Sequence, residues 1–131
     1  MVIKEHEFYY LAQQNINLDE KYDELMDIIV SENFGGDYAA SLVFEELFVN
    51  IYNYAYKTKG AGPIMVNIEK TDDGILITLA DFGIPFNPVE RANWMASSKE
   101  IGGRGIDLVK SYSKKFQYQR VYGMNVVQVL V

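Results

Sequence analysis

The chain has 131 residues, a length that suits one domain, 1–131, with a core large enough to need no disulfide or metal. Its composition, 49% hydrophobic and 14% aromatic, excludes a disordered protein. The net charge of −6 argues against direct nucleic-acid binding, and the lack of cysteine excludes disulfides and zinc–sulfur sites. No apolar run reaches the roughly 18 residues of a membrane span and no signal peptide is seen, so a cytoplasmic protein is expected.

The first half of the sequence predicts one strand followed by two helices. Residues 5–13 are expected to form the strand. Residues 19–31 are expected to form an amphipathic helix, because apolar residues recur there at helical spacing: Leu18, Tyr22, Leu25 and Ile29. A second, more apolar helix is predicted at 38–56, and Asp37 suits its N-cap.

The second half predicts two β-hairpins separated by a loop and a short helix. Residues 64–68 alternate and pair with 75–79 across a turn at 71–74. Residues 85–103 show no period and are expected to form a functional loop, and a helix follows from about residue 106. A closing hairpin, 116–121 with 125–131, turns at Gly123. The element order β-α-α-β-β-α-β-β indicates an α+β two-layer sandwich, with a mostly antiparallel mixed β-sheet and helices on one face.

The helix at 38–56 carries a polar stripe on an otherwise apolar surface. Glu46, Asn50 and Asn53 follow one another at i, i+4 and i+7, which places them within roughly 60° of one another. A buried carboxylate beside two amides is costly unless a partner satisfies it. The stripe is therefore either a row of polar side chains that are hydrogen-bonded within the protein beneath a loop, or a site for a metal and a phosphate. The second is chemically reasonable, because Mg²⁺ prefers carboxylate, amide and phosphate oxygens.

Two further clusters have a similar ambiguity. Asp81-Phe82-Gly83-Ile84-Pro85-Phe86 follows a strand, and is either a common turn or a site where Asp81 accepts a hydrogen bond from a base. Gly102-Gly103-Arg104-Gly105 precedes a helix, where free N–H groups and the helix dipole favour a phosphate. It is not a P-loop, because no Lys-Ser/Thr follows, and it is not a dinucleotide fingerprint, because Leu108 replaces the last glycine.

Together and in this order, the three clusters resemble the N, G1 and G2 boxes of the Bergerat (GHKL) ATP-binding fold. The match is closest to the bacterial anti-sigma factor serine/threonine protein kinases. The resemblance lies in Glu46 and Asn50 of the N box, in Asp81, Gly83 and Pro85 of the G1 box, and in Gly102, Gly103, Gly105 and Ile106 of the G2 box. The closing Gly123-Met124-Asn125 also resembles that branch, whereas Tyr54 stands where it commonly has His.

The resemblance implies ATP and Mg²⁺ as cofactors and assigns a role to each box. Asn50 would coordinate Mg²⁺, with Asn53 supporting the magnesium or phosphate shell, and Glu46 would act as general base. Asp81 would bind the adenine amino group. The base pocket would also include Gly83 and Pro85, and residues 87–101 would form the lid. The phosphates would be met by the G2 box, at Gly102, Gly103, Gly105 and Ile106, with Arg104 either on a phosphate or in solvent.

The resemblance further implies a kinase that phosphorylates a STAS anti-anti-sigma partner and sequesters a sigma factor, as a homodimer that contacts neither membrane nor nucleic acid. The alternative is a nucleotide-gated protein-binding module without phosphoryl transfer. Retention of Glu46 argues for the kinase, because binding alone needs no base. A third interpretation, an ATP-hydrolysing domain from a larger machine, is disfavoured by the short length and the closing hairpin.

Overall fold

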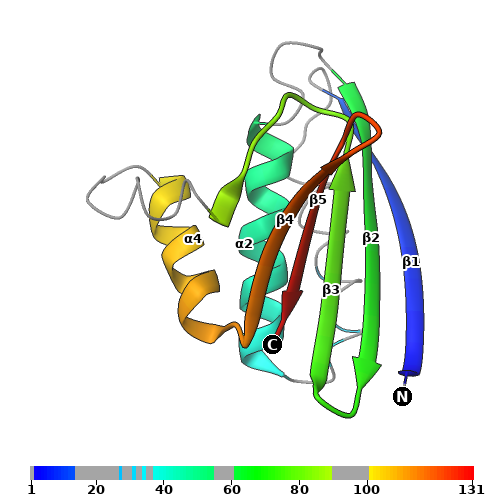
Figure 1. The fold of residues 1–131 in the computed structure, drawn as a ribbon, viewed down its shortest axis with the longest axis vertical. Coiled ribbons are helices and arrows are strands. Elements are labelled where there is room, and N and C mark those ends of the chain that lie inside the picture. The colour runs from blue at the N-terminus through cyan, green and yellow to red at the C-terminus, as the bar shows by residue number, and fades with distance from the viewer. Residues whose placement is uncertain are drawn as a thin grey trace.

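The computed structural model describes residues 2–13, 27, 31, 34, 37–54, 61–89 and 101–131. Figure 1 shows two layers, a twisted sheet with two helices on one of its faces. The elements, in chain order, are β1 Val2–Gln13, α2 Tyr38–Tyr54, β2 Ala61–Thr71, β3 Gly74–Asp81, α4 Ile101–Tyr112, β4 Lys115–Val121 and β5 Met124–Leu130. The predicted α+β two-layer sandwich is confirmed.

The five described strands form one sheet in the order β1-β2-β3-β5-β4. Every pairing between them is antiparallel, so the parallel component of the predicted mixed sheet is not found in the described part of the chain. The reason is topological. After α4 the chain returns to β4, which runs parallel to β3, but β5 lies between the two strands and separates them.

Both predicted hairpins are confirmed, and each has a two-residue turn. The β2–β3 turn at Asp72 and Asp73 is fastened by Thr71, whose hydroxyl donates to Gly74 O at 2.9 Å. The β4–β5 turn places Tyr122 and Gly123 at φ of 48° and 79°, the left-handed pair that a tight hairpin requires.

Helix α2 begins where the sequence predicted and forms the centre of the core. Asp37 caps it, since Asp37 Oδ1 accepts a hydrogen bond from Ala40 N at 3.0 Å. The apolar face of α2 is fully buried against the sheet, at Val43, Phe44, Leu47 and Phe48. Residues 55 and 56 lie outside the described residues. So does most of the predicted helix 19–31, of which Asp27 and Ser31 are described as helical.

Three predicted boundaries were wrong. β1 begins at Val2 rather than at residue 5. β2 begins at Ala61 rather than at residue 64, because its pairing with β1 continues to Gln13↔Ala61. α4 begins at Ile101, so the glycines at 102, 103 and 105 lie in its first turns instead of in a preceding loop. Buried Ile106 and Val109 fix this helix against the core, and its first N–H groups still lack helical acceptors.

The expected loop 85–103 is described only at its two ends. Pro88 and Val89 have helical backbone, and residues 90–100, most of the predicted lid, lie outside the described residues. Within the described ranges, no helix is long and apolar enough to cross a membrane.

Candidate functional site

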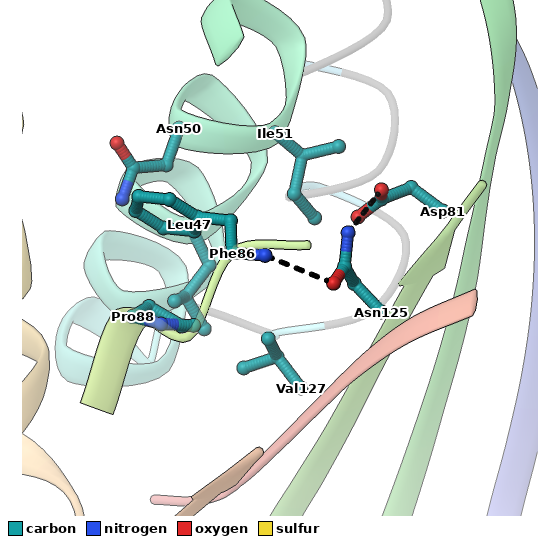
Figure 2. Close-up of a pocket in the computed structure, with 8 residues that line it drawn as sticks. All are labelled: Leu47, Asn50, Ile51, Asp81, Phe86, Pro88, Asn125 and Val127. Atoms are coloured by element: carbon teal, nitrogen blue, oxygen red, sulfur yellow. Dashed lines mark hydrogen bonds between the residues drawn. The ribbon is translucent and has the colours of Figure 1, made fainter. Parts of the chain in front are cut away.

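A cavity lies between α2 and the ends of β3 and β5 (Figure 2). The space in it that a water-sized sphere can occupy is about 20 Å³, room for one water, and the wider hollow of about 370 Å³ includes open solvent. The cavity is lined by Leu47, Asn50, Ile51, Asp81, Phe86, Pro88, Asn125 and Val127. Its walls are therefore mostly apolar, with three polar side chains, as is usual for a small-molecule site.

Asp81 is the acidic group of this cavity. It is the last residue of β3, on the strand face that alternation buries, and it is only 3% exposed. Its Oδ1 accepts hydrogen bonds from Gly83 N at 2.8 Å and from Asn125 Nδ2 at 2.9 Å. Among the described residues nothing donates to Oδ2. One carboxylate oxygen therefore has no donor in the described part of the chain.

Burial raises the pKa of Asp81 above its ordinary value. The hydrogen bonds from Asn125 and Gly83, and the positive charge of Arg120, act in the opposite direction and only partly offset the loss of hydration. Arg120 is placed for this effect by β4, where it pairs with Asn125 and donates from Nη1 to Gly83 O at 3.0 Å.

Asn125 connects the loop after β3 to the sheet. Its Nδ2 donates to Asp81 Oδ1 and to Ile84 O, at 2.9 and 2.8 Å. Its Oδ1 accepts from Phe86 N at 3.1 Å and from the Tyr118 hydroxyl at 2.6 Å. The amide thus uses both its donors and both its acceptor positions. This 3%-exposed side chain holds the 82–86 loop in place beside Asp81.

This role of Asn125 was not predicted from the sequence, and neither were the roles of Arg120 and Tyr118. A signal was present. Side chains alternate between the two faces of a strand, so Asn125 lies on the same face of β5 as Val127 and Val129. A polar side chain therefore stands on a face that is otherwise apolar and buried.

Asn50 faces the same cavity from α2. It is 8% exposed, and no described residue makes a hydrogen bond with its side chain. Leaving a buried amide unpaired costs about 1–3 kcal/mol, a cost that a molecule bound in the cavity would remove. In Figure 2 the Phe86 side chain extends toward the Asn50 amide, whereas the Phe86 backbone is bonded to Asn125.

Glu46 lies one turn before Asn50 on the stripe that the sequence predicted. It is partly buried and does not line the cavity. Burial, and second the negative charge of neighbouring Glu45, raise its pKa above the ordinary value. A carboxylate with a raised pKa is a better proton acceptor near neutral pH than an ordinary one.

The other predicted site residues lie in several places. Gly83 is buried next to Asp81, while Pro85 is exposed and the cavity wall is formed instead by Phe86 and Pro88. Ile106 packs in the hydrophobic core. The backbone of Asn53 continues α2, and the G2-box residues form the first turns of α4, at Gly102, Gly103, Arg104 and Gly105. The side chains of Asn53 and Arg104 lie outside the described residues.

A metal ion at this site would need oxygen atoms from a bound phosphate as well as from the protein. Among the described residues, no group of three His, Asp or Glu side chains is placed to hold an ion. The Asn50 amide oxygen is the available protein ligand at the cavity. Mg²⁺ commonly takes one or two protein oxygens and completes its shell with phosphate and water, so the residues present fit a phosphate-bound Mg²⁺.

The α+β sandwich thus brings a buried acid at the end of β3 and an amide on α2 to one cavity. The profile of the histidine kinase-like ATPase domain family matches residues 23–130, and the chain belongs to this family. Membership implies ATP binding, and it does not distinguish the anti-sigma factor kinases from other branches. No curated protein gave a match.

Proposed function

We propose that the protein is an ATP-dependent serine/threonine protein kinase of the anti-sigma factor type. The observation that carries the proposal is the cavity in which Asn50 and one oxygen of Asp81 lack partners among the described residues. An amide oxygen for Mg²⁺ and a carboxylate oxygen for an adenine amino group are the two contacts that the resemblance assigns there.

Each residue then has a defined task. Asp81 Oδ2 accepts a hydrogen bond from the adenine amino group, and Asn125 keeps the carboxylate in that orientation through its bond to Oδ1. Asn50 would hold Mg²⁺, which would supply charge neutralisation at the phosphates. The N-terminal turn of α4, at 101–105, presents backbone N–H groups to the phosphates, as helix N-termini commonly do.

Glu46 receives the proton of the acceptor hydroxyl. The hydroxyl oxygen bonds to the γ-phosphorus, and the bond from that phosphorus to the ADP oxygen breaks. The raised pKa of Glu46 suits this task, and a positioned base typically contributes about 10²–10⁴-fold to the rate.

Nucleotide entry requires the cavity to widen. Its 20 Å³ of space for a water-sized sphere is far below the roughly 300 Å³ of a typical ligand pocket. Phe86 and Pro88 belong to its wall, and both follow the end of β3. We place the movement in the Phe86 side chain and at Pro88, because Asn125 holds the Phe86 backbone and the paired strands β3 and β5 fix Asp81 and Asn125.

The partners follow from the resemblance alone. They are a STAS anti-anti-sigma protein as the phosphate acceptor and a sigma factor as the sequestered client, bound by a homodimer in the cytoplasm. The second candidate is a nucleotide-gated binding module without phosphoryl transfer. It is favoured by one observation, that Glu46 lies outside the cavity that Asn50 lines.

The test is incubation with γ-labelled ATP, Mg²⁺ and a STAS protein. The kinase predicts label on the STAS protein that disappears in Glu46→Gln, while this variant still binds nucleotide. Glu45→Gln is the matched control, because it removes the adjacent exposed carboxylate and leaves burial, the larger cause of the raised pKa of Glu46, so most of the transfer should be kept. Nucleotide binding without transfer to the cognate STAS protein would support the binding module instead.

A further inference from the structure

The last part of the chain differs in charge from the rest. Residues 108–131 contain four basic residues and no acidic one, although the whole chain has a net charge of −6. The four are Lys110, Lys114, Lys115 and Arg120. Three of them lie at the two ends of β4: Lys114 and Lys115 at its start, and Arg120 near its end. All three are exposed, so they give this strand a positive surface.

β4 is also an edge of the sheet. It pairs with β5 on one side, and no other strand of the described structure pairs with its opposite side (Figure 1). The hydrogen bonds between β3, β5 and β4 show which backbone groups of β4 point away from the sheet. Val131 exchanges both backbone hydrogen bonds with Ile75, at 2.9 and 3.3 Å. Along an antiparallel strand, successive residues form their backbone hydrogen bonds with opposite neighbours. Because Val131 bonds β3, the odd-numbered residues of β5 bond β3 and its even-numbered residues bond β4.

It follows that Gln117 and Gln119 of β4 are bonded to β5, through Gln128 and Val126. The N–H and C=O groups of Phe116, Tyr118 and Arg120 point away from β5. A row of three such residues is a template for one more strand.

The side chains of β4 would allow another strand to pair with its free edge. Between its charged ends the strand is Phe116-Gln117-Tyr118-Gln119, with no charge in the middle. On the face turned away from the helices, a hollow of about 430 Å³ runs along β4 and β5, lined in part by Gln117, Gln119 and Gln128. This hollow gives room for the alternate side chains of an added strand.

We propose that the β4 edge is a docking site for an extended, acidic segment of a partner protein, which binds as a sixth strand. Charge complementarity selects this occupant. Carboxylates at the two ends of the segment meet Lys115 and Arg120, and uncharged residues between them pair with the middle of β4. A second copy of β4 is disfavoured, because its basic ends would face those of the first.

Hydrogen exchange followed by NMR tests the edge in the free protein. The amides of Phe116, Tyr118 and Arg120 should exchange about 100-fold faster than those of Gln117 and Gln119, because only the latter two are in the ladder. Equal protection of all five amides would overturn the proposal, since it would mean that the edge is already covered.

Binding is tested with a fluorescein-labelled peptide of six residues, alternating valine and threonine with glutamate at both ends, so that the two glutamates are five positions apart, as Lys115 and Arg120 are. We expect it to bind and to slow exchange at Phe116, Tyr118 and Arg120. Lys115→Glu should weaken binding about tenfold by reversing one charge at the contact, and Lys70→Glu on β2, an equal charge change elsewhere, should not. A peptide N-methylated at the residues facing β4 should not bind.

Three results would contradict the proposal. They are the absence of binding at millimolar peptide, equal binding of a peptide with lysine in place of glutamate, and tighter binding of an oligothymidine. Protection of the same three amides by raising the protein concentration alone would assign the edge to self-association instead.

Discussion

Replacement of Asn125 by alanine should be the most damaging single change at the site. The substitution removes four hydrogen bonds from a side chain that is 3% exposed. The bond to the Asp81 carboxylate is worth about 1.5–3 kcal/mol, and each of the three neutral bonds about 0.5–1.5 kcal/mol. We therefore expect the free energy of unfolding to fall by about 3–7 kcal/mol, a size of loss typical of buried hydrogen-bond networks.

Urea unfolding followed by circular dichroism measures this loss. Gln128→Ala is the matched control, because it removes an amide from the same strand that makes one hydrogen bond, to Thr78 at 3.3 Å. The control should lose less than about 1 kcal/mol. Because the bond from Asn125 lowers the pKa of Asp81, the variant should also become less stable as the pH rises. A loss in Asn125→Ala no greater than in the control would refute this account of the loop.

Three other variants separate ligand contacts from structural ones. Asn50→Ala should abolish Mg²⁺-dependent ATP binding in a calorimetric titration and leave the unfolding free energy within about 1 kcal/mol, because the amide has no partner among the described residues. A raised pKa means that Asp81 stabilises the fold below its unfolded pKa and loses this effect as the pH rises through the folded pKa. Asp81→Asn should therefore remove that fall in stability on a pH series, and also lose ATP, since its amide donates toward the adenine amino group. Gly74→Ala should cost about 2 kcal/mol in thermal unfolding, because its φ is 139° and a Cβ would lie 2.4 Å from Val131 O; normal stability would contradict the strained geometry.

The sequence predicted the elements whose local signals are strong. Alternation in 64–68 and 75–79 gave the first hairpin, and Asp37 correctly marked the start of α2. The sequence also predicted that Asn50 and Asp81 belong to one site. In the structure both line one cavity. Whether they bind nucleotide stays a prediction until the titrations above are made.

Other features depend on contacts that no local pattern contains. Alternation in β5 marks Asn125 as a polar residue on the buried face, but its partners, Asp81 and the 82–86 loop, are defined only when β5 pairs with β3. The start of α4 was wrong because glycines favour a loop locally, whereas burial of Ile106 and Val109 extends the helix back through them.

The site joins segments that are far apart along the chain. The bonds from Asn125 to Asp81 and from Arg120 to Gly83 span 44 and 37 residues, and both need the β4–β5 hairpin in place. Contacts of such long separation form late, because closing the intervening loop costs entropy before the contact is gained. During folding, the segment after β3 therefore has no anchor until the final strand is added. Recovery of ATP binding in a refolding experiment should accordingly report completion of the sheet, and should lag behind the formation of α2.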